Sequence, residues 1–423
     1  MIRFLTLGLV RDKHRSWGPV AMVALGVALC VLLEAWMSGA RNSYIETNAL
    51  LSTGHVKIQT AKAIGDHQEK ALDLALLGLG DLVGELEKNQ PDLEWVPRVY
   101  FGALLDASLN ETGTQAPVAG MGFALWGGKS EVERLKLRQN LTQGRLPVEP
   151  NQALVSDRLF KTLGLHLGQK VTMIGSDFNG SMAVVNLEVV GTLRFGVAQL
   201  DKGALVMNLG DVQRVLALED GATELLGFFK AGRYLPERAA ALAKHYNLEH
   251  HSGETPFGPR MLTLEEQNDL ESLLKTVEAT GAATTWVFVL VLGVLLLNAG
   301  LMGGVRRYGE LGLRLALGES KRHLYLSLVA ESLVVGLTGC TLGLALGLPF
   351  ALYLQNHGLD LQGMITGQTA MLISDTIRAE VSLKTLAAGL LPGLLAPLLG
   401  SSLAGLVIFG RDTSQLFKEL EAT

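Results

Sequence analysis

A short, strongly basic stretch at residues 306–322 lies between two long apolar runs. In a helix that turns ~100° per residue, four of its charged side chains fall within a sector of roughly 60°: Arg307, Glu310, Arg314 and Lys321. The leucines at 311, 315 and 317 lie outside that sector. Two interpretations follow, either an amphipathic helix that offers a binding surface to a soluble protein, or a solvated loop that only maintains topology.

Other chemistry-bearing groups do not form a recognisable site. Residues 122–130 resemble a phosphate-binding loop, but Phe123 occupies the position where the first glycine is required. Histidines and glutamates gather near residue 250 without the His-Glu-x-x-His order, so a solvated turn explains them better than a metal site. No Ser-His-Asp arrangement with a nucleophile elbow is present. The sequence therefore predicts no catalytic residue and no metal site.

Two carboxylates and a row of glycines lie inside apolar runs. Glu34 is near one end of its run and can reach the interface, whereas Glu331 lies deeper and is expected to face protein or water. Small residues recur at a spacing of three to four along the third long run, which suits close helix packing within the chain or across a dimer. These packing residues are Gly336, Gly339, Gly343 and Gly347.

Composition indicates a membrane protein. The 423 residues are 48% hydrophobic and 18% charged, with a mean hydropathy of +0.29. The net charge of −5 and the lack of a basic block with aromatics argue against nucleic acid as a partner. The two cysteines, Cys30 and Cys340, both lie in apolar runs, so neither a disulfide nor a cysteine metal site is expected.

Four segments are long enough to cross a bilayer core, which needs about 20 residues. We expect spans at residues 17–40, 284–304, 326–354 and 386–409. A cleaved signal peptide is the alternative for the first, with residues 38–40 as the cleavage site, but its apolar run is long for that purpose. Lys and Arg concentrate in residues 1–16 and 305–325, whereas Arg378 alone marks residues 355–383. Both termini and the basic stretch should therefore face the cytoplasm.

These spans define the predicted fold class: an α-helical membrane protein with four transmembrane helices and a large α+β extracytoplasmic domain between the first two. The predicted segments are an amphipathic N-terminal segment (1–16), the outside domain (41–283), a coupling loop (305–325), an outer loop (355–385) and a cytoplasmic tail (410–423). The outside domain is large enough for two subdomains.

Alternating and helical apolar patterns divide the outside domain further. We expect strands at 54–59, 95–105, 115–123, 153–156, 168–173, 182–195 and 204–208. We expect helices at 69–88, 130–140, 157–163, 211–218 and 236–246. Helical spacing over 262–280 predicts a stalk that runs into the second span.

The basic stretch resembles a known permease family. Residues 310–318, Glu-Leu-Gly-Leu-Arg-Leu-Ala-Leu-Gly, are similar to the E-x-G-x-R-x-A-x-G signature that follows the second span in the family of FtsX, MacB and the lipoprotein-releasing LolC and LolE. Residues 155–172, and residues 189–196 followed by Asp201 and 204–209, resemble that family's outside domain. The layout of one span, a large outside domain and three further spans, with no ATPase, is closest to LolC and LolE.

The resemblance implies a transport subunit, not an enzyme, in the inner membrane with its large domain in the periplasm. ATP and Mg²⁺ would be bound by a separate cytoplasmic ABC ATPase, and this chain would carry no cofactor. A second permease, identical or different, would complete the complex. The ATPase-coupling residues implied are Arg307, Glu310, Gly312, Arg314, Ala316, Gly318 and Lys321.

The resemblance leaves the cargo open. LolC and LolE imply a lipoprotein or another amphipathic substrate handled at the outer leaflet, in contact with membrane lipid. FtsX implies instead a scaffold whose motion activates a periplasmic partner such as a cell-wall hydrolase. MacB implies export with a periplasmic adaptor.

Overall fold

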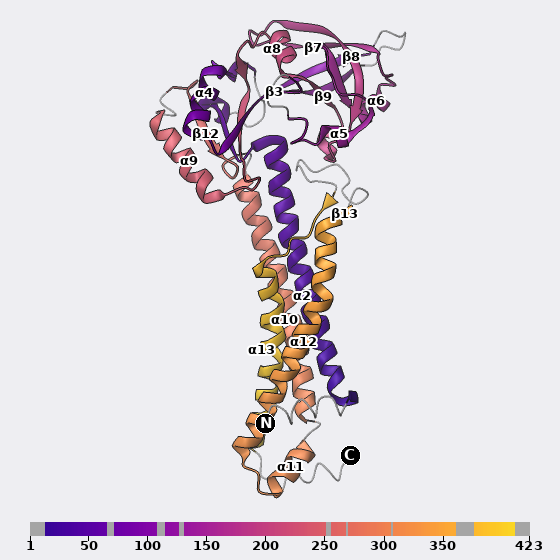
Figure 1. The fold of residues 1–423 in the computed structure, drawn as a ribbon, viewed down its shortest axis with the longest axis vertical. Coiled ribbons are helices and arrows are strands. Elements are labelled where there is room, and N and C mark those ends of the chain that lie inside the picture. The colour runs from indigo at the N-terminus through magenta and orange to yellow at the C-terminus, as the bar shows by residue number, and fades with distance from the viewer. Residues whose placement is uncertain are drawn as a thin grey trace. The chain divides into compact units, whose positions relative to one another are not determined.

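A computed structural model describes residues 13–65, 72–107, 115–126, 131–250, 255–267, 270–305, 308–360 and 376–410 (Figure 1). The chain divides into two units. The membrane unit contains residues 1–42, 276–359 and 377–423, and the outside unit contains residues 43–275 and 360–376. Helices α2 and α10 each continue from one unit into the other.

The outside unit has the mixed α+β composition that its sequence pattern predicts. Its main strands are β1 Val56–Thr60, β3 Leu93–Asp106, β4 Gln115–Phe123, β5 Leu141–Gly144, β6 Gln152–Ser156, β7 Lys170–Ser176, β8 Met182–Leu193, β9 Ala204–Asn208, β11 Glu224–Phe229 and β12 Pro259–Thr263. Short strands β2 Leu76–Leu77 and β10 Gly221–Ala222 pair with each other. The helices are α3 Ala61–Gly65, α4 Leu79–Asn89, α5 Leu137–Asn140, α6 Asp157–Thr162, α7 Ala198–Asp201, α8 Leu209–Val215 and α9 Pro236–Glu249, with a π-helix at Ala49–Thr53 and a 3₁₀ turn at Leu72–Leu74.

Strand β3 joins two parts of the sheet. Its first half pairs antiparallel with β11, which continues through β1 to β12. Its second half pairs with both β4 and β7. From β4 the pairing runs through β9, β6 and β8 back to β7, so these six strands close a ring. Because these strands close on one another, few of their edges stay unpaired. Strand β5 is a short addition that pairs with β8.

The core follows the alternation of the strands. In β9, Leu205 and Met207 belong to one hydrophobic cluster, whereas Ala204 and Val206 belong to a second. All five residues of β9 are buried, so both faces of this strand are covered. The second cluster is covered by the turn-rich segment 131–137, which supplies Val132, Leu135 and Leu137.

A buried ion pair lies beside this second cluster. Arg98 and Glu131 are both 0% exposed. The Arg98 guanidinium donates to both carboxylate oxygens of Glu131, at 2.6 Å from Nη2 and 3.0 Å from Nε. Arg98 also donates to the Tyr100 hydroxyl, which donates in turn to the Leu51 carbonyl at 2.9 Å. The contact ties the end of the first long helix region to the sheet.

The membrane unit is built from long apolar helices. They are α2 Lys13–Asn48, α10 Leu270–Val305, α12 Lys321–His357 and α13 Leu383–Gly410, with the short α11 Tyr308–Ala316 between α10 and α12. Strands β13 Leu359–Asp360 and β14 Thr376–Ile377 pair between α12 and α13. Among the described residues, four helical stretches are apolar and long enough to cross a membrane: Trp17–Thr53, Leu270–Leu295, Lys321–His357 and Leu383–Leu406.

The glycine row of α12 packs within the chain. A Cβ added at Gly339 would lie 2.6 Å from Val23 Cβ, and one at Gly343 would lie 2.6 Å from the Ala24 carbonyl oxygen. Gly347 faces Ala28 of α2, whereas Gly336 faces α13. In this chain the row therefore lies against α2 and α13.

Three predicted helices differ from the structure. The predicted stalk at 262–280 is wrong at its start, because residues 259–263 form β12 and pair with β1, and α10 begins at Leu270. In the predicted helix 130–140, the described residues 131–136 form turns and only Leu137–Asn140 is helical. In the predicted helix 69–88, described helix α4 begins at Leu79, after β2; residues 66–71 lie outside the described residues.

Candidate coupling segment

Helix α11 forms the centre of the basic stretch and ends in a defined turn. Glu319 N donates to the Arg314 carbonyl at 3.1 Å, and Gly318 N donates to the Leu315 carbonyl at 3.0 Å. Gly318 has φ +92°, in the left-handed region that favours glycine. These three features make a Schellman motif, which closes the helix by satisfying its last carbonyls. Because nothing lies within 4 Å of a Cβ at Gly318, backbone conformation and not space requires glycine there.

The next helix begins directly after this turn. Ser320 is its N-cap, and the Ser320 hydroxyl accepts from His323 N at 3.3 Å. Lys321 is therefore the first residue of α12 and does not continue α11. The expectation that Lys321 shares one helical sector with Arg314 is wrong, because the turn at Gly318 interrupts the helix between them.

The structure places the other predicted coupling residues as follows. Arg314 and Ala316 are exposed near the end of α11, and Gly312 is buried. Glu310 lies within α11, one turn before Arg314. Arg307 lies outside the described residues.

Two exposed leucines extend the surface beyond the charged residues. Leu313 is 55% exposed and Leu317 is 80% exposed, and they are spaced four residues apart. Together with Arg314 they form an exposed face that is both basic and apolar, here called the α11 face. Of the two, only Leu317 was considered from the sequence, where it was set aside because it lies off the charged sector. Their unusual feature, two apolar residues four positions apart in a short basic segment outside any expected span, was nevertheless visible in the sequence.

Three further polar contacts involve Glu34 and the histidines near residue 250. Thr285 of α10 donates to the Glu34 carboxylate of α2 at 3.2 Å. His250 Nε2 lies 3.2 Å from Glu85, and His245 Nε2 lies 3.7 Å from Glu249. Within the described part of the chain, no group of three or more His, Cys, Asp or Glu side chains is arranged to hold a metal ion.

Two family models match the chain. The MacB-like periplasmic core domain matches residues 20–240, and the FtsX-like permease C-terminal region matches residues 282–413. The first match alone covers more than half of the chain.

Individual relatives match over parts of the sequence. The macrolide export ATP-binding/permease protein MacB of Bdellovibrio bacteriovorus is 36% identical over 86 residues, which make up 20% of this chain and 13% of that protein. The periplasmic region of MacB from Actinobacillus actinomycetemcomitans is 14% identical, with a TM-score of 0.35, and covers 54% of this chain and 97% of that one.

The extracellular domain of the ABC-type transporter YknZ from Gram-positive bacteria is 10% identical, with a TM-score of 0.32, and covers 49% of this chain and 99% of that one. The family assignment depends on the two family models, which match the outside domain and the last three apolar helices in the expected order. The chain belongs to the FtsX/MacB family of ABC transporter permeases.

Proposed function

We propose that this chain is a permease subunit that converts ATP hydrolysis by a separate cytoplasmic ATPase into motion of its outside domain. This proposal depends mainly on the continuity of α10. It is a single helix of 36 residues, about 54 Å long at 1.5 Å per residue. It begins at Leu270, after β12, and ends at Val305, before α11. A rigid helix of this length transmits displacement from one end to the other.

The α11 face supplies the docking surface in this proposal. Exposed Leu313 and Leu317 offer apolar anchors, and Arg314 offers a charge that fits an acidic rim. Gly312 is buried and Gly318 fixes the turn, so both act on the shape of the segment and not on its charge. ATP and Mg²⁺ would be held by the ATPase.

We propose that the substrate is a lipoprotein or another amphipathic molecule moved at the outer leaflet. The support is the overall layout, which resembles LolC and LolE. A second candidate is export with a periplasmic adaptor, favoured by the match of residues 20–240 to the MacB-like core domain. Activation of a periplasmic partner, as implied by FtsX, is a third candidate. The co-purification experiment described below distinguishes these three candidates.

The coupling role is tested by two substitutions in the basic stretch. Glu310→Lys reverses a charge and Gly312→Trp places a large side chain at a buried position, so both are expected to uncouple ATP hydrolysis from transport while membrane insertion continues. The matched control is Glu237→Lys, the same charge change on an exposed position of α9. ATPase activity and substrate release would be measured in the reconstituted complex. Full activity of both variants contradicts the coupling role.

The partners are tested by purifying the detergent-solubilised chain from its native membrane and identifying every co-purifying protein and lipid. An ATPase with lipoproteins supports the substrate proposed above, and a second permease in the sample defines the pairing. An ATPase with an adaptor or a hydrolase and no lipoprotein supports one of the other candidates. Absence of any ATPase contradicts the coupling proposal itself.

A further inference from the structure

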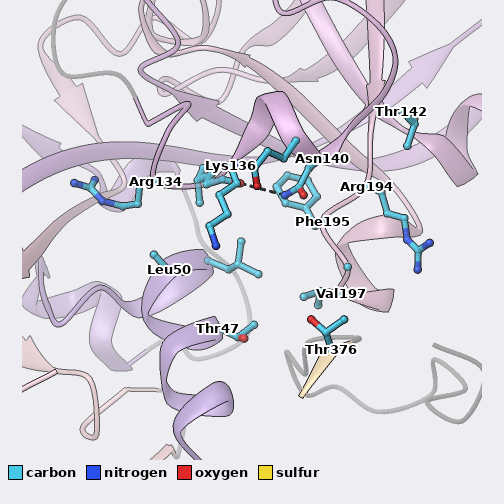
Figure 2. Close-up of a pocket in the computed structure, with 14 residues that line it drawn as sticks. Thr47, Leu50, Arg134, Lys136, Asn140, Thr142, Arg194, Phe195, Val197 and Thr376 are labelled. Carbon is cyan, nitrogen blue, oxygen red and sulfur yellow. Dashed lines mark hydrogen bonds between the residues drawn. The ribbon is translucent and has the colours of Figure 1, made fainter. Parts of the chain in front are cut away.

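A cavity in the outside unit has no role in the coupling described above. Its volume is about 480 Å³, within the usual range for small-molecule sites. Its walls come from the end of the first long helix region, from segment 134–142 and from segment 194–197, with Thr376 at one side. Figure 2 shows these side chains around the open space. All of the lining residues belong to the outside unit.

The charge of the lining has one sign. Among the described residues, the charged side chains that line the cavity are all cations: Arg134, Lys136 and Arg194. Arg134 pairs with Glu94 at 2.5 Å, and Arg194 Nε lies 4.0 Å from Asp201. Within the described part of the chain, no carboxylate forms an ion pair with Lys136. An exposed ammonium beside two further cations makes the cavity attractive to an anion.

The backbone at Lys136 is held in an unusual conformation. Lys136 has φ +49° and ψ +36°, a left-handed conformation that costs about 1 kcal/mol or more for a residue with a side chain. The Lys136 carbonyl accepts from the backbone N–H groups of Gln139 and Asn140, at 2.9 and 3.0 Å. Figure 2 shows the Lys136 side chain extending toward Leu50 and Thr47. A strained lysine in a turn where glycine is the least strained choice points to a use for its charge.

The same cavity has apolar walls. Leu50, Leu51 and Phe195 are half-buried and Val197 is buried. Phe195 is held in place because its backbone N–H donates to Asp201 at 2.7 Å. A cavity with cations on one side and aliphatic and aromatic surface on the other suits a ligand that has an anionic head and an apolar part.

We infer that this cavity binds the phosphate-type head group of an amphiphile, with Lys136 and Arg194 at the anion and Leu50 and Phe195 against the adjoining alkyl segment. Phosphate oxygens accept charge-assisted hydrogen bonds from both cations. The volume accommodates a head group with a short stretch of chain. This inference holds whether or not the chain is driven by an ATPase.

The test uses the full chain in a phosphate-free maltoside detergent and a phosphate-free buffer, with hexyl phosphate, inorganic phosphate and hexanol as probes in calorimetric titrations. We expect hexyl phosphate to bind about tenfold more tightly than inorganic phosphate, because only the former contacts the apolar wall. Hexanol should bind least, because it lacks the anion.

Lys136→Gly separates ligand binding from folding. Glycine adopts the left-handed conformation without strain, so the thermal midpoint should stay the same or rise, while affinity for hexyl phosphate should fall about tenfold with the lost charge. Arg194→Gln should lower this affinity as well. The matched control is Lys244→Gln, an exposed lysine on α9 away from the cavity, which should bind as the wild type does.

Three results would overturn the inference. If Lys136→Gly binds hexyl phosphate as tightly as the wild type does, Lys136 does not bind the anion. Equal affinity for hexanol and hexyl phosphate shows that the head group is not recognised. Equal affinity for inorganic phosphate and hexyl phosphate assigns the cavity to free phosphate and rejects the amphiphile.

Discussion

At the residue scale, buried polar groups of the outside unit set its response to pH and to substitution. His55 is 7% exposed, and its Nδ1 accepts from the Phe229 backbone N–H at 2.9 Å. Its ring stacks on Phe229 with centroids 5.4 Å apart. Burial, with a smaller contribution from the positive charge of Arg134, lowers the pKa of His55 from 6.5 to about 4.

This shift predicts acid sensitivity. Between pH 6.5 and about 4, the unfolded chain binds a proton at His55 that the folded chain does not bind, so stability is lost as pH falls through that window. The loss is about 3 kcal/mol at its largest. His55→Asn keeps a hydrogen-bond acceptor and removes the titration, so its unfolding free energy should depend less on pH in this range. Denaturant unfolding at several pH values measures both slopes, and equal slopes would rule out His55 as the cause.

The Arg98–Glu131 pair predicts a different kind of sensitivity. Arg98→Met leaves the Glu131 carboxylate buried without its main partner, which typically costs about 3–5 kcal/mol. The double variant Arg98→Met, Glu131→Leu removes both charges and should regain much of that loss. Thermal unfolding of the full chain in detergent gives the comparison. A single variant as stable as the wild type would mean that water or another cation compensates Glu131.

At the element scale, apolar periodicity predicted most local structure correctly. The expected strands at 115–123 and 204–208 are confirmed with the same bounds as β4 and β9. Errors arose where distant pairing decided the outcome. Residues 262–263 were expected to begin the stalk helix, but pairing with β1 makes them the end of strand β12. Segment 131–136 forms turns and ends in the left-handed Lys136, a backbone conformation that no apolar pattern signals.

The coupling segment, like the fold, was predicted in part from the sequence. The short signature at 310–318 indicated where the segment lies, and glycine at its end is explained by the positive φ of Gly318. The break before Lys321 was missed because the helical projection assumed one continuous helix through that glycine. The exposure of Leu313 and Leu317 was missed because it depends on what packs around α11, which spacing alone does not reveal.

Helix packing in the membrane unit predicts the effect of enlarging a glycine. Gly343→Val would place atoms 2.6 Å from the Ala24 carbonyl oxygen and 2.7 Å from Val27 Cβ, so α2 and α12 must separate. Such overpacking costs about 1–3 kcal/mol. The matched control is Gly293→Ala in α10, where nothing lies within 4 Å of the added Cβ. Thermal unfolding in detergent should show a lower midpoint only for Gly343→Val; equal midpoints would contradict this packing.

At the scale of the whole molecule, the distribution of basic residues predicts the orientation of the two exposed regions. Met182 of β8 is 76% exposed and Leu317 after α11 is 80% exposed. A cysteine at either position should therefore be accessible to a labelling reagent. In a background with Cys30→Ala and Cys340→Ala, a membrane-impermeant maleimide should label Met182→Cys in intact cells. Leu317→Cys should react only after the inner membrane is permeabilised. Labelling of Leu317→Cys in intact cells would reverse the topology.

The pairing of β1 also constrains biosynthesis. β1 is the first main strand to leave the membrane after α2, yet its two partners, β11 and β12, are the last strands of the outside unit to be synthesised. During export β1 therefore remains an unpaired edge while the intervening chain crosses, which makes folding slow and the nascent domain prone to aggregation. Because α10 is the next element after β12, completion of this sheet and insertion of the second span become neighbouring steps. A chain that stalls before Pro259 contains β11 but leaves the other edge of β1 without its partner β12.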